Sequence, residues 1–74
     1  MSSFLKEEKK GTIILFANTL WFFEKFKYDL IIFLSKYFLI KCIYLRSGDN
    51  LDKEKIESLR KNKNVSLMSL NYFL

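Results

Sequence analysis

The chain has 74 residues, of which 50% are hydrophobic and 28% charged, and its formal net charge is +5. This length allows one small domain, and the composition is too apolar for a disordered chain and too charged for an integral membrane protein. One cysteine and no histidine exclude an intrachain disulfide and a Cys/His metal site, and the even spread of 13 basic and 8 acidic residues predicts no nucleic-acid partner.

Residues 1–11 are expected to form an N-terminal tail before a folded domain over residues 12–74. Lys9 and Lys10 precede an apolar run, as in a secretory signal. However, the bulky and charged residues from Trp21 to Lys25 stand where a cleavage site requires small side chains. We therefore expect no signal peptide and a cytoplasmic location.

Membrane insertion is disfavoured by the length of the apolar segments. The longest uncharged stretch, Gly11 to Phe23, has 13 residues, whereas a spanning helix needs about 20. The next apolar segment, Leu30 to Leu45, is interrupted by Lys36 and Lys41, which are costly near the centre of a bilayer. A membrane-associated hairpin of these two segments remains an alternative.

A change in the spacing of apolar residues along the chain predicts the first strand and the first helix. Residues 12–17, TIILFA, are continuously apolar, as in a strand buried on both faces. From Leu20 to Tyr37 the period is helical, and Asn18 or Thr19 is suited to cap this helix. The stripe expected to face the core consists of Phe23, Phe26, Leu30, Phe33, Leu34 and Tyr37. The charged residues expected on the solvated side are Glu24, Lys25, Asp29 and Lys36.

The second half of the chain continues the alternation. Residues 38–45, FLIKCIYL, predict a second buried strand. The turn RSGDN follows, and Asp49 or Asn50 is expected to cap a short amphipathic helix from Leu51 to Lys61. Residues 65–70, VSLMSL, predict a third strand. The order β-α-β-α-β predicts an α/β fold: half of a Rossmann-like parallel sheet with right-handed crossovers.

Such a half sheet is expected to have one uncovered face. If the strands lie in chain order, both helices fall on the same side, although the apolar runs require cover on both. We therefore expect the first half of a doubly wound domain, completed by a missing C-terminal part or by another chain. An interaction module that hides this face by homodimerising is a further alternative.

The stretch TIILFANTLWFFEKFKYDLIIFLSK resembles the amino-terminal opening of glycosyltransferases of the GT-B fold, specifically the family 4 type of bacterial capsule and lipopolysaccharide synthesis. The pattern extends over residues 12–72, and ANTLWFFEKFK is its most distinctive part. Family members commonly have Arg-Leu-Pro-Leu in place of residues 27–30 and a Gly near residues 36–38, from which this chain departs. The strand order 1-2-3 is taken from this resemblance.

The resemblance implies the acceptor-side part of an enzyme that transfers a sugar from a nucleotide-sugar donor to a cell-surface glycan or a lipid-linked acceptor. The donor domain with its paired glutamates would lie beyond residue 74, so we expect no cofactor site, and no activity, in this chain alone. The turn after the first strand would line the cleft between the two domains, which makes Asn18, Thr19 and Trp21 the candidate cleft-lining residues. A helix cap at Asn18 or Thr19 and a packed aromatic at Trp21 are the competing structural interpretations.

No catalytic or metal-binding residues are predicted. Cys42 lies within a strand and has no histidine to activate it. The carboxylates near the start of the second helix are explained by the positive end of the helix dipole. They are Asp49, Asp52, Glu54 and Glu57.

Peripheral contact with the inner face of a membrane also remains open. Lys25, Lys27 and Lys36 are expected on a solvated face. With Ile31 and Ile32 partly off the core stripe, they could alternatively touch an anionic lipid surface.

Overall fold

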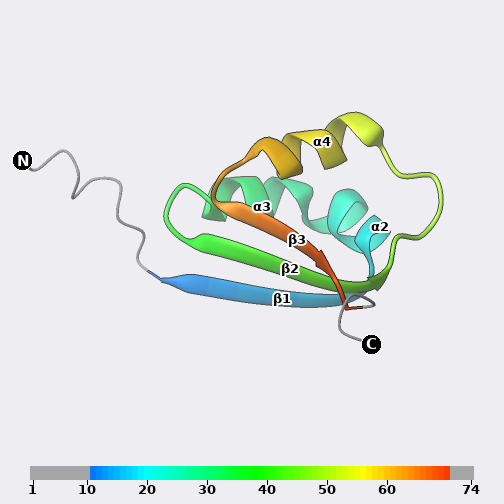
Figure 1. Cartoon of the computed structure of the whole chain (residues 1–74). Helices are drawn as coiled ribbons and strands as arrows, with labels where there is room; N and C mark the ends of the chain where they lie inside the picture. The colour runs from blue at the N-terminus through cyan, green and yellow to red at the C-terminus, as the bar shows by residue number, and fades with distance from the viewer. Residues whose placement is uncertain (1–10, 71–74) are drawn as a thin grey trace, which may run out of the picture.

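The computed structural model describes residues 11–70, which form one three-stranded parallel sheet with the strand order β1-β2-β3 (Figure 1). The strands are β1 (Thr12–Thr19), β2 (Leu39–Arg46) and β3 (Val65–Ser69). Between β1 and β2 lie α2 (Leu20–Phe22), the π-helical turn η1 (Phe23–Lys27) and α3 (Tyr28–Leu34), and between β2 and β3 lies α4 (Lys53–Lys61). The α/β class and the parallel sheet are confirmed. Most of the expected tail, and residues 71–74, lie outside the described residues.

All the helices cover the same face of the sheet (Figure 1). Buried and more exposed residues alternate along the central strand, β2. Its buried residues, Ile40, Cys42 and Tyr44, lie beneath the helices. The helices contribute Leu20, Phe23 and Ile31 from the first crossover and Ile56 and Leu59 from the second. The core is therefore a single layer between one sheet face and the helices.

The opposite face of the sheet is open among residues 11–70. Ile14 is 51% exposed and Phe16 is 72% exposed, and both alternate with residues that pack beneath the helices. Leu39 and Leu45 at the two ends of β2 are also exposed on this side. The expectation of a sheet covered on one face only is thus confirmed for the described part of the chain.

The prediction of which residues of the first helix face the core is wrong for most of the stripe. Phe26 is 63% exposed and Phe33 is 55% exposed, whereas Ile31, expected partly off the stripe, is fully buried. The reason is η1, whose wider turn adds one residue after the buried Phe23, so that each later core position falls one residue further along. The displaced rings pack on one another at the surface: Trp21 with Phe26 at 5.4 Å between centroids, and Phe33 with Tyr37 at 5.6 Å.

A polar cluster joins the ends of the two crossovers. The buried Ser35 follows α3, and its Oγ donates to the carbonyl of Ile32 at 2.7 Å and accepts from Asn62 Nδ2 at 3.0 Å. Asn64 Nδ2 donates to the Ser35 carbonyl at 3.0 Å. These bonds satisfy carbonyl and hydroxyl groups where α3 ends, and they hold the loop that leads into β3.

The shifted helix register can be tested with two truncations of similar size. Ile31→Ala should lower the free energy of unfolding by about 2 to 5 kcal/mol, because it opens a cavity in the core. Leu30→Ala should cost less than about 1 kcal/mol, because its side chain is 45% exposed. Urea denaturation of both variants measures the difference, and equal losses would contradict the register described above.

Candidate functional site

The candidate site lies at the carboxyl ends of the strands, where open α/β sheets bind their ligands. There the turn from β1 into α2 lies beside the loop that follows β2 (Figure 1). The backbone N–H of Trp21 donates to the carbonyl of Ser47 at 3.0 Å, which joins the two connections directly.

Gly48 allows this close approach. Its φ is +87°, and a Cβ atom added there would lie 2.7 Å from the Cβ of Trp21 and 3.3 Å from that of Thr19. Any other residue would collide with the turn after β1 as well as adopt a strained backbone. The sequence identified RSGDN as a turn, but the contact that demands glycine involves residues far away in the chain.

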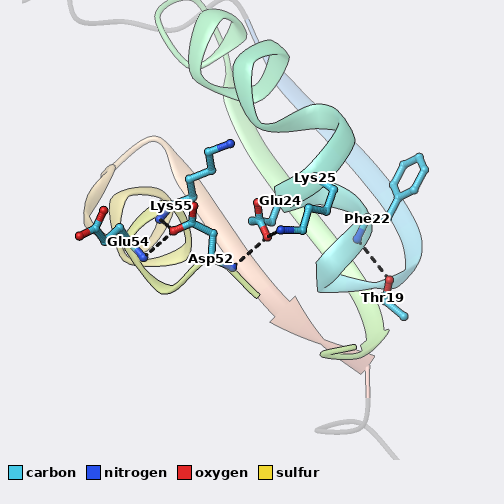
Figure 2. Close-up of polar contacts among 7 residues, drawn as sticks. All are labelled: Thr19, Phe22, Glu24, Lys25, Asp52, Glu54 and Lys55. Atoms are coloured by element: carbon cyan, nitrogen blue, oxygen red, sulfur yellow. Dashed lines mark hydrogen bonds and ion pairs between the residues drawn. The ribbon is translucent and has the colours of Figure 1, made fainter. Parts of the chain in front are cut away.

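Thr19 caps the first helical segment. Its Oγ1 accepts from the N–H of Phe22 at 3.2 Å, and its backbone is extended as an N-cap requires (Figure 2). The capping interpretation is therefore confirmed for Thr19. Asn18 instead belongs to β1, where the alternation of the strand puts it on the same side as the exposed Phe16.

The three predicted cleft-lining residues lie around one hollow. This shallow hollow has a volume of about 330 Å³ and runs beside β1; its lining residues are Phe16, Ala17, Asn18, Thr19, Trp21 and Phe22. Thr19 and Trp21 also border a neighbouring hollow of about 640 Å³, together with Arg46, Gly48, Asp49 and Asn50. Thr19 and Trp21 thus line both hollows.

Sequence reasoning did not select Arg46. It is the last residue of β2 and pairs in register with Thr19, so the sheet brings it to the same edge. Its position directly before the glycine turn was the available signal. Together with the Trp21 indole, the guanidinium and the side chains of Asp49 and Asn50 offer donors and acceptors that suit a hydroxyl-bearing ligand.

The buried side chain of Glu24 anchors the end of the loop that borders the second hollow. Glu24 is 1% exposed, and its Oε1 accepts from the N–H of Asp52 at 2.9 Å while Lys25 Nζ lies 3.1 Å away (Figure 2). The prediction of a solvated Glu24 is therefore wrong. Its partner amide lies 28 residues further along the chain, so no local pattern reveals the contact.

Asp52 in turn caps α4. Its Oδ1 accepts from the N–H groups of Glu54 at 3.0 Å and Lys55 at 3.2 Å (Figure 2). The expectation that Asp49 or Asn50 would cap this helix is wrong, because the helix begins at Lys53 and Asn50 adopts a positive φ of 56° in the loop. Glu24 and Asp52 together fix where the loop ends and the helix starts.

Cys42 lies in the middle of β2 and is fully buried. Burial raises the pKa of its thiol from 9.0 to about 11, which keeps the thiol protonated at neutral pH. The side chain therefore behaves as a small apolar core residue.

Residues 11–70 contain neither a metal-binding cluster nor a membrane-spanning helix. No group of three or more Cys, Asp and Glu side chains in residues 11–70 is arranged to hold a metal ion. Within the same residues, no helix has the length and apolar character needed to cross a bilayer. The segments considered for a membrane hairpin form β1 with the helical turns after it, and the end of α3 with most of β2.

No protein-family model, curated protein or solved structure matches this chain.

The acceptor role of Glu24 can be separated from its charge. Glu24→Ala leaves the Asp52 N–H without its acceptor and should lower the free energy of unfolding by about 1 to 3 kcal/mol. Glu24→Gln keeps an oxygen in the same place and should cost clearly less. The exposed Glu57→Ala serves as the control, with a change within about 0.5 kcal/mol in the same denaturation series. Equal losses for the Ala and Gln variants at Glu24 would show that the charge dominates.

The buried thiol predicts a pH dependence of stability above pH 9. In the unfolded chain Cys42 ionises near its ordinary pKa of 9.0, while in the folded protein its pKa is about 11. The folded state thus binds more protons in this window, and its stability should fall by up to about 1.4 kcal/mol per pH unit. The Cys42→Ala variant should not show this fall in stability. Urea denaturation from pH 8 to pH 10.5 measures the difference, and parallel curves for the two proteins would contradict it.

Proposed function

We propose that this chain supplies the acceptor-side part of a GT-B-type glycosyltransferase, which transfers a sugar from a nucleotide-sugar donor to a cell-surface glycan or a lipid-linked acceptor. The observation that carries the proposal is the open sheet, which has its helices on one face and exposed apolar side chains such as Ile14 and Phe16 on the other. A β-α-β-α-β unit of this kind fits half of a doubly wound domain.

The hollow beside β1 supports a role in acceptor binding. Asn18, Thr19 and Trp21 line it at the carboxyl end of the strand, where a cleft against a second domain would form. The Thr19 hydroxyl already accepts the Phe22 N–H, so the side chains more available to a ligand are the amide of Asn18 and the indole of Trp21. An amide beside an aromatic face suits the polar edge and apolar face of a sugar ring.

In this proposal, the nucleotide part of the donor binds a second domain outside residues 1–74. The turn from β1 to α2 contains no glycine. The Thr19 hydroxyl accepts the Phe22 N–H, and the Ser47 carbonyl accepts the Trp21 N–H. A close approach of the backbone to a phosphate group is therefore unsupported at this turn. This chain would hold the acceptor and not the nucleotide.

Peripheral contact with the inner face of a membrane belongs to the same proposal. Phe22, Phe26 and Phe33 are exposed on the first crossover, and Lys27 Nζ lies 6.0 Å from the centre of the Phe22 ring. Exposed aromatic rings flanked by lysines suit the boundary between anionic headgroups and acyl chains. Ile31 takes no part in this surface, since it is fully buried. Such contact would bring the acceptor hollow close to a lipid-linked substrate.

The experiment is reconstitution in trans. Residues 1–74 are co-expressed with a family 4 glycosyltransferase of capsule synthesis from which the corresponding first three strands and two helices have been deleted. Sugar transfer from a labelled nucleotide sugar to the acceptor should return. Trp21→Ala should reduce the transfer at least tenfold without preventing assembly, whereas Lys53→Glu on the exposed side of α4 should leave transfer unchanged.

Two results would favour other functions. A complex that assembles without sugar transfer would overturn the glycosyltransferase proposal and favour an interaction module. A homodimer of residues 1–74 that dissociates and unfolds on dilution would identify the second candidate, a self-associating module, which the uncovered apolar face also supports.

A further inference from the structure

The uncovered face of the sheet is mostly apolar and carries a charge at its centre. Strand alternation and register define its rows: Ile14 pairs with Lys41 and Lys41 with Ser66, and in the next row Phe16 pairs with Ile43 and Ile43 with Met68. The apolar members include Ile14, Phe16, Leu39, Ile43, Leu45 and Met68. We refer to these two rows, with Leu39 and Leu45, as the uncovered face.

Lys41 is the charged residue within this face. It lies on the central strand between Ile14 and Ser66, and Leu39 and Ile43 stand on either side of it along β2. It is exposed, and it takes part in none of the ion pairs found among residues 11–70. A charge at the centre of an apolar face limits what can cover that face.

Whatever covers the face removes water from the Lys41 ammonium. An unpaired buried ammonium is strongly unfavourable, whereas a well-placed carboxylate opposite it offsets part of that cost. A partner that is apolar throughout is therefore disfavoured. A second copy packed symmetrically through the middle of the face is also disfavoured, since it would bring two Lys41 side chains together.

The shape of the face selects a helix. Parallel sheets pack helices against their faces, and the face is about as long as β2, whose eight residues span roughly 26 Å. A helix of about 18 residues has the same length. An apolar stripe on such a helix could pack on Ile14 beside Lys41 and on Phe16 and Ile43 in the next row.

We propose that the uncovered face binds one amphipathic partner helix, whose apolar stripe packs on Ile14, Phe16 and Ile43 and whose Asp or Glu side chain pairs with Lys41. The inference rests on the proposed function to the extent that a second part completes the sheet. Its test needs no sugar transfer, so the two proposals can fail separately.

The test is a selection of helices in cells by a split reporter. Residues 1–74 carry one half of the reporter, and the other half is fused to a library of 18-residue helical peptides randomised along one face. Helices selected with the wild-type chain should carry Asp or Glu within an apolar stripe. Helices selected with Lys41→Glu should carry Lys or Arg at that place.

Charge exchange then measures the pairing itself. Lys41→Glu should weaken a helix selected by the wild-type chain at least tenfold, and exchanging the carboxylate of the helix for lysine should restore binding. Phe16→Asp should abolish binding because it puts a charge into the apolar row. Lys53→Glu, the same charge change on α4, should leave binding unchanged.

Several results would overturn the proposal. The first is that no recovered helix depends on Phe16 for binding. The second is that the selected helices show no preference for a carboxylate. The third is self-association of the chain that protects Phe16 in the absence of a helix. Binding of residues 1–74 to phosphatidylglycerol vesicles that is lost in Lys41→Glu, without helix selection, would instead assign the face to a membrane surface.

Discussion

The structure depends on one constraint, which is that both crossovers of a parallel sheet turn with the same hand. Because the strands lie in the order β1-β2-β3, this constraint brings every helix to one side (Figure 1). Burial of Ile40, Cys42 and Tyr44 follows on that side. Exposure of Phe16 on the other side is the consequence of the same rule.

Polar contacts at the two ends of the sheet hold the helices in place. At the carboxyl end, Glu24 accepts from Asp52 and Trp21 donates to Ser47, so the first crossover supports the loop before α4. At the opposite end, Ser35 joins the end of α3 to the segment before β3 through Asn62. The candidate hollows therefore stand on connections joined by hydrogen bonds, and their walls are formed mainly by β1, α2 and the loop after β2.

Two apolar surfaces remain on the described part of the chain, and they differ in character. The uncovered sheet face carries Lys41 at its centre, which suits a single partner that supplies a carboxylate. The displaced rings of Phe26 and Phe33 are exposed on the first crossover, in the part of the chain proposed above to contact a membrane. The high aromatic content of 18% thus divides between core packing and surfaces that other molecules can cover.

The sequence by itself determined the elements and their order, because continuous apolar runs and helical spacing are local properties. Each strand boundary was correct to within two residues, and of the two cap candidates, Asn18 and Thr19, Thr19 is the cap in the structure. Tertiary structure decided the rest. The π-helical turn moved Ile31 into the core in place of Leu30, since the fit of a helix to the sheet, and not its own period, sets which side is buried. The burial of Glu24 and the need for glycine at position 48 arise from contacts between segments far apart in the chain, which only the folded sheet brings together.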